Sequence, residues 1–225
     1  MTDDGKILKV KRREQYRTVD ELVKRSEPSQ VYYTLLVLSS FIVASGLLLD
    51  NSTIVIGGML ITPVLAPILM VALGLAIGRP DLMRKVGMSI AKSFLVIIAS
   101  SVLLTLLFGG TSGYYIFENT VRTAALYFVV ALAAGVAATF AWTRKELAEV
   151  LPGIAIAVSL VPPLSLIGIS LSSFDFGVAR FSFLIFLLNM VGILGGSLVV
   201  FSLLKFYKNE KEIEKKVIKA DGKIS

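Results

Sequence analysis

Apolar residues occur along the chain in six long runs, which short polar segments separate. Each run is close to the roughly 20 residues that an α-helix needs to cross the hydrocarbon core of a membrane. Lipid offers the backbone no hydrogen-bond partners, so such runs are expected to be helical. The pattern predicts an all-α integral membrane protein with six transmembrane helices. The predicted spans are Val31–Leu49, Thr53–Gly78, Val86–Phe108, Val121–Ala141, Leu147–Leu171 and Arg180–Leu204.

The polar segments divide the chain into three predicted parts. Residues 1–30 carry charges of both signs, and we expect a cytoplasmic N-terminal tail with a short helix around Val19–Arg25. Residues 31–204 form the six-helix transmembrane domain. Residues 205–225 alternate Glu with Lys and predict a charged cytoplasmic helix or tail. This last segment is either a solvated extension of the sixth span or a surface that binds a neighbouring subunit.

Lys and Arg residues are distributed unequally between the two predicted sides of the membrane. Twenty of the 23 lie in the two tails and in the short charged loops Arg79–Lys85 and Trp142–Lys145. The opposite side holds Arg122 and Arg180, and Lys92 lies inside the third span. Cytoplasmic loops carry an excess of Lys and Arg, so both termini are predicted to be cytoplasmic and the protein to lie in the cell (inner) membrane.

Composition supports the membrane prediction and narrows the function. Hydrophobic residues make up 55% of the chain and charged residues 17%. The net charge of +7 is explained by topology and contact with anionic headgroups, and no nucleic-acid partner is expected. The chain has no Cys and no His, and the predicted membrane interior has no pair of acidic residues. Most protease and metal chemistries are thereby excluded, so we expect no enzyme and no cofactor.

The two halves of the chain match in hydropathy when one is shifted by 96 residues. The predicted repeats are residues 31–108 and 121–204. At this shift Pro67 falls on Pro163 and Arg84 falls on Arg180. Identity over the overlap is no better than that of unrelated apolar segments, so the register of the runs carries the argument. Each half has three spans, an odd number, so the second half must start from the opposite side. The sequence predicts two inverted three-helix repeats, with helices 2 and 5 broken at prolines.

The second span is interrupted near its centre by Pro63 and Pro67. Proline has no N–H and clashes with the carbonyl four residues earlier, so the carbonyls of Met59 and Pro63 should be freed. A carbonyl in the membrane interior needs a partner. Thr62, a neighbouring helix, water or a cation are the candidates.

The fifth span is interrupted in the matching place by Pro162 and Pro163, which should free the carbonyls of Val158 and Ser159. Half-helices that begin near Pro67 and Pro163 also present positive N-terminal ends, which suit an anion. Interrupted helices at matching positions of inverted repeats point to a transport site. The sign of the ion stays open, and ordinary kinks repaired by Ser and Thr are the alternative.

Polar residues near or within the spans provide further candidates. Lys92 either attracts an anion or gates a pathway, or it extends back to the interface. Asn189 lies in the sixth span and is either a ligand or a contact between helices. Asp50, Asn51 and Ser52 join the first two spans and form either a helix cap or an outer access site that concentrates cations.

Small residues spaced four positions apart predict closely packed helices. The motifs are Gly74–Gly78, Gly192–Gly196 and the run Ala131–Ala138. They do not separate contacts within one subunit from contacts between subunits, and we expect a homo-oligomer.

Two segments of the chain resemble a known family. Asn51–Leu82 is NSTIVIGGMLITPVLAPILMVALGLAIGRPDL and Leu151–Leu171 is LPGIAIAVSLVPPLSLIGISL. Together they resemble the hydrophobic family called domain of unknown function 389, over roughly residues 30–205. The resemblance implies a prokaryotic membrane protein with several spans and carries over no activity. Many members look as if they have an additional cytoplasmic N-terminal domain, and the short tail of this chain departs from that.

These observations predict a membrane protein that transports a small solute or ion. The expected form is a carrier with a site near the midplane, between broken helices 2 and 5. The alternatives are an ion channel that uses the same site and a scaffold or sensor whose C-terminal helix recruits a cytoplasmic partner.

Overall fold

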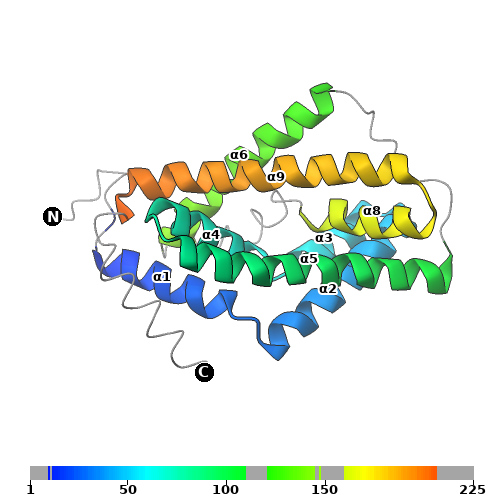
Figure 1. Cartoon of the computed structure of the whole chain (residues 1–225), viewed down its shortest axis with the longest axis horizontal. Coiled ribbons are helices and arrows are strands. Elements are labelled where there is room, and N and C mark those ends of the chain that lie inside the picture. Colours follow the sequence, from blue (N-terminus) through cyan, green and yellow to red (C-terminus); the bar gives the residue numbers. More distant parts are fainter. Residues whose placement is uncertain (1–9, 11, 110–120, 145–146, 148–159, 207–225) are drawn as a thin grey trace.

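The computed structural model describes residues 10, 12–109, 121–144, 147 and 160–206, and in these ranges it contains helices and no strand. The helices form an elongated bundle in which α5 and α9 run in opposite directions along the long axis (Figure 1). They are α1 (Arg12–Ser26), α2 (Gln30–Leu48), α3 (Ser52–Ile61), α4 (Leu65–Ala76), α5 (Pro80–Phe108), α6 (Val121–Thr143), α8 (Val161–Ser172) and α9 (Phe176–Leu203).

Several of these helices are long and apolar enough to cross a membrane. By length and composition α2, α5, α6 and α9 each qualify, and α3 and α4 qualify together as one span bent by 59°. Within the described ranges the chain therefore has four or five candidate spans. The predicted fifth span is described only from Leu160 onward, where it forms the short apolar helix α8.

Helices α5 and α9 begin earlier than the apolar runs predict. Helix α5 begins at Pro80, six residues before Val86, because proline suits the first helical position. Helix α9 begins at Phe176, since the Asp175 carboxylate accepts hydrogen bonds from the N–H groups of Gly177 and Val178, both at 3.1 Å. The prediction of a charged loop at Arg79–Lys85 was wrong, because most of this segment forms the first turns of α5.

The polar N-terminal segment packs on the bundle through a helix longer than the predicted Val19–Arg25. Helix α1 packs mainly against α4. Its buried side chains are three or four residues apart, as on one helix face: Gln15, Thr18, Val19 and Leu22. The Gln15 Nε2 donates a hydrogen bond of 2.9 Å to the Leu204 carbonyl at the end of α9. The first and last described helices are thus joined at one end of the molecule.

Glycines bring α6 and α9 into close contact. A Cβ on Gly196 would lie 2.2 Å from the Leu132 carbonyl oxygen, and one on Gly135 would lie 2.3 Å from that of Ile193. A Cβ on Gly192 would lie 2.8 Å from the Cβ of Ala131 on α6. The close packing predicted for Gly192–Gly196 and for Ala131–Ala138 therefore occurs within the chain. Gly78 differs, because its φ of 69° ends α4 and nothing lies near its missing Cβ.

Candidate functional site

The second predicted span breaks at three residues, Thr62, Pro63 and Val64, which lie between α3 and α4. Helix α3 ends because Pro63 has no N–H to continue it. The Thr62 N–H donates instead to the Met59 carbonyl, at 3.3 Å. The carbonyl of Met59 was predicted to be free, and this was wrong: one tighter turn provides it with a donor three residues later.

Ser39 of α2 completes the hydrogen bonds of the break. Its Oγ donates to the Gly58 carbonyl at 2.9 Å and also pairs with the Thr62 Oγ1. A hydroxyl has one proton, so with Ser39 donating to Gly58, Thr62 must donate to Ser39. Both lone pairs of the Thr62 oxygen are then available to accept. Sequence reasoning missed Ser39, although two adjacent serines in the middle of an apolar run were a signal for it.

A cavity of about 550 Å³ opens at the break. Thr62, Pro63, Leu65 and Ala66 contribute to its wall from the break and the start of α4. The rest of the wall comes from the end of α1, the start of α2 and the end of α6, and it includes Lys24, Arg25, Glu27, Ser29, Tyr32 and Trp142. The break is therefore accessible to a small molecule from the side where α1 packs.

An aromatic side chain fixes one charge of that wall. The Arg25 guanidinium lies over the Trp142 ring, with its central carbon 5.7 Å from the ring centroid. A cation in this position is attracted by the ring face and is held at the cavity. Helices α1 and α6 are thereby linked beside the break.

Helix α8 carries the prolines of the fifth predicted span at its second and third positions. These are places where a helix needs no N–H from the residue, so Pro162 and Pro163 start α8 without interrupting it. Val158 and Ser159 lie outside the described residues, and the freeing of their carbonyls stays a prediction. Within α8 the hydroxyls of Ser165 and Ser170 are buried and have no hydrogen-bond partner in the described ranges.

Helices α4 and α8 correspond closely. Leu65–Ala76 shifted by 96 residues is Val161–Ser172, so their bounds coincide, and Pro67 and Pro163 are each the third residue. In Figure 1, α4 ends at the left of the bundle and α8 ends at the right. Each packs against both α5 and α9. The two helices are therefore alike in length and proline position and point to opposite ends.

The turns that follow these helices also correspond. After α4 the Arg79 N–H donates to the Gly74 carbonyl at 2.9 Å, and after α8 the Asp175 N–H donates to the Ser170 carbonyl at 2.9 Å. The residue before each donor is left-handed, with φ of 69° at Gly78 and 56° at Phe174. These are the hydrogen bonds and backbone conformation of a Schellman helix end.

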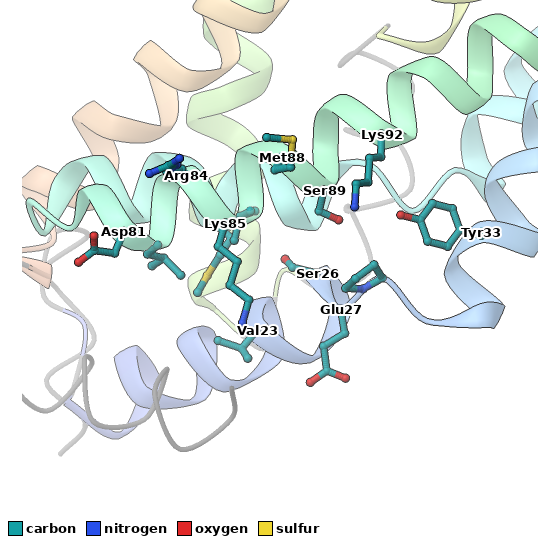
Figure 2. A pocket seen from close by; sticks show the side chains of 14 residues that line it. Val23, Ser26, Glu27, Tyr33, Asp81, Arg84, Lys85, Met88, Ser89 and Lys92 are labelled. Carbon is teal, nitrogen blue, oxygen red and sulfur yellow. The ribbon is translucent and has the colours of Figure 1, made fainter. Parts of the chain in front are cut away.

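The other predicted site residues lie apart from the break. Lys92 is exposed and contributes to a separate cavity on α5 (Figure 2). Asn189 is buried in α9, at 2% exposure. Asp50, Asn51 and Ser52 are exposed, and the Asn51 Oδ1 accepts from the N–H groups of Thr53 and Ile54 at 3.1 and 3.2 Å. The capping role foreseen for this turn is therefore present at Asn51, and its role as an outer access site stays a prediction.

Among the described residues, no three His, Cys, Asp or Glu side chains lie together in a way that could hold a metal ion. The groups at the break are hydroxyl oxygens, the N–H groups at the start of α4 and the charged side chains of the cavity wall. These groups can bind a small polar solute by hydrogen bonding and charge.

Comparison with known proteins gives a family and no activity. A curated relative, an uncharacterised protein of Methanocaldococcus jannaschii, is 24% identical over 200 residues. The match covers 85% of this chain and 58% of the relative, so the chain spans less than two thirds of that protein's length. No solved structure matches. The family model described as Domain of unknown function (DUF389) matches residues 59–194, from the end of α3 into α9, and the chain belongs to this family.

Proposed function

We propose that this protein transports a small polar solute or ion across the membrane, as a carrier built from two inverted three-helix repeats. The observation that carries the proposal is the correspondence of α4 and α8. They share length, proline position and terminal turn at an offset of 96 residues, and they point to opposite ends. Half-helices at matching positions of inverted repeats form the binding sites of many transporters.

The solute would bind at the break between α3 and α4. The Thr62 oxygen offers lone pairs, while α4 begins without a side-chain cap, so N–H groups of its first turn are donors without an intrahelical acceptor. A site with donors and acceptors suits a small polar solute. The equivalent start of α8, with Pro162 and Pro163, would complete the site in the other half.

The test is flux through the purified full chain in liposomes. Charge movement on a solid-supported membrane would be screened with Na⁺, K⁺, H⁺, Cl⁻ and common organic anions, and radiotracer uptake would detect electroneutral exchange. We expect saturable flux that falls about tenfold or more in Thr62→Val, since binding loses a hydroxyl that accepts from the solute. Absence of both currents and uptake for every solute would contradict the proposal.

Ser39 and Ser40 provide a matched pair for this test. Both side chains are fully buried in α2, but Ser40 donates only within its own helix, to the Leu36 carbonyl at 2.6 Å. Ser39→Ala removes the contact to the break and should lower flux, whereas Ser40→Ala should leave it unchanged. Equal loss in both variants would argue for a general packing effect.

A channel would use the same break and is separated from a carrier by counterflow. A carrier accelerates uptake of labelled solute when unlabelled solute is present on the other side, while a channel gives single-channel currents and no such acceleration.

The scaffold alternative depends on the C-terminal segment, most of which lies outside the described residues. We also propose that the chain self-associates, with the exposed apolar side chains Leu126, Val129 and Val130 of α6 as a surface on which a second copy would replace lipid.

A further inference from the structure

A second cavity, of about 580 Å³, lies between the start of α5 and the connection from α1 to α2. It is distinct from the cavity at the break, although Glu27 contributes to both. Its wall combines cations, hydroxyls and apolar side chains, and Figure 2 shows them from close by. No part of the proposed transport cycle uses this cavity.

Lysines of α5 supply its positive charge. Lys85 and Lys92 are seven residues apart, which is about two helical turns or 10.5 Å. In Figure 2 Lys85 extends toward α1 beside Val23, and Lys92 extends into the space beside Ser89 and Tyr33. Arg84 is the third cation of the wall and extends to the other side of α5. Within the described ranges, the side chain of Lys92 forms no ion pair. The lysines therefore place positive charge along this side of α5.

Three hydroxyl groups lie near the lysines. Ser89 is on α5 between Lys85 and Lys92, and Tyr33 extends from α2 toward the same space (Figure 2). The Ser26 Oγ at the end of α1 is buried and has no hydrogen-bond partner among the described residues. Hydroxyls can donate to an anion, so they extend the set of donors that the lysines begin.

Two carboxylates also contribute to the wall, Glu27 and Asp81. Figure 2 shows the Glu27 carboxylate directed away from Lys92 and Ser89, and Asp81 at the far end of the cavity from Lys92. Asp81 lies in the first turn of α5, where the helix dipole stabilises a negative charge. Neither carboxylate therefore occupies the space between the two lysines.

Apolar side chains make up most of the remaining wall: Val23, Met70, Leu82, Val86 and Met88. After Lys92 helix α5 has no charged residue, and its last 16 residues, Ser93–Phe108, extend about 24 Å. Lys92 thus marks the border between a charged and an apolar stretch of the helix. At such a border a ligand meets headgroup charge and acyl chain together.

We propose that this cavity binds the phosphate group of an anionic ligand between Lys85 and Lys92. Two chemical sources carry that group, a glycerophospholipid such as phosphatidylglycerol and free inorganic phosphate. The apolar wall and the position at the border of the apolar stretch favour the lipid, because an acyl chain can cover the methionines and valines while the headgroup meets the lysines.

The test measures binding to the purified full chain in detergent. Thermal unfolding would be followed during titration with short-chain phosphatidylglycerol, with zwitterionic phosphatidylcholine of the same chain length, and with inorganic phosphate. We expect phosphatidylglycerol to raise the unfolding temperature at lower concentration than phosphatidylcholine. Lys85→Gln and Lys92→Gln should each weaken phosphatidylglycerol binding about fivefold, and Lys92→Arg should retain it.

Arg180→Gln is the matched control, since Arg180 is exposed on α9, 96 residues after Arg84 and outside the cavity. It should leave binding unchanged. A response to inorganic phosphate that also depends on Lys92 would identify the free anion as the source. Equal responses to the two lipids, or a phosphatidylglycerol response that both lysine variants retain, would overturn the site. Lys92 is exposed, so its variant is expected to fold, and gel filtration checks this.

Discussion

Helices α4 and α8 have the same length and the same ends, but different helices cover them. Both pack against α5 and α9. Helix α8 is then covered by α2, whereas α4 is covered by α1. The counterpart of α2 at the 96-residue offset is α6, which within the described ranges makes no extensive contact with α4 and packs closely on α9 instead. Correspondence between the halves therefore holds for the helices with prolines and for their packing against α5 and α9, and it fails for the helix that covers each of them.

This difference indicates what could distinguish the two ends of a carrier. If α4 and α8 form equivalent half-sites, the helix that covers each controls access from its side. The residues that correspond to α1 at this offset, 108–122, lie mostly outside the described residues. Helix α1 carries Lys24 and Arg25, two of the charged residues in the wall of the cavity at the break. Access to α4 would then depend on the polar helix α1, and access to α8 on the apolar helix α2.

Disrupting the contact between α6 and α9 should give the largest loss of stability. In Gly196→Ala the added methyl group meets the backbone of α6, which cannot move away without separating the two helices. We expect a loss of about 3 kcal/mol in the free energy of unfolding. The measurement is the midpoint of unfolding by sodium dodecyl sulfate in mixed micelles.

Gly195→Ala is the control for that variant. The Cβ there would have an ordinary contact of 3.7 Å with the end of the Leu132 side chain. Its stability should be unchanged or higher by up to about 1 kcal/mol, since alanine favours a helix over glycine. Similar losses in both variants would mean that α6 does not pack on α9 as described.

Weakening the packing of α1 on α4 should give the next largest loss of stability. Leu22→Ala removes a fully buried side chain from the packed face of α1, and we expect a loss of about 2 kcal/mol. Hydrogen exchange followed by mass spectrometry should then show faster exchange of amides in α1 and α4, with α8 unchanged. The exposed Arg13 provides the control, Arg13→Ala. Faster exchange in α8 to the same degree would remove the distinction between the two covers.

The proline break could be predicted because its cause is local. A proline lacks an N–H wherever it occurs, so the interruption near Pro63 follows from the sequence alone. The partner that repairs the break is Ser39, 23 residues before Thr62 and on another helix. No local pattern encodes which helix lies beside a break. The hydrogen bond between Gln15 and Leu204, separated by 189 residues, was beyond sequence reasoning for the same reason.

Charge misled the prediction of where α5 begins. The segment Arg79–Lys85 is polar, and a polar segment between apolar runs was taken as a loop. Hydropathy reports where a chain can lie in lipid, whereas a helix begins where its backbone N–H groups are satisfied or absent. Pro80 supplies that condition, and the helix places Lys85 and Lys92 about two turns apart in the wall of one cavity.

The smallest effect concerns the starts of α5 and α9. These helices follow the corresponding turns after α4 and α8, but they begin in different ways. Helix α5 begins with Pro80 and has no side-chain cap, whereas α9 begins with the Asp175 carboxylate bonded to two N–H groups. Asp175→Ala should therefore cost about 1 kcal/mol in the same unfolding assay, and Asp175→Asn should retain most of the stability, because an amide oxygen also caps. Equal losses in the two variants would show that the charge of Asp175 matters more than its hydrogen bonds. A loss only in the alanine variant would mean that the two halves start the helix after the turn by different means, with proline in one and a side-chain cap in the other.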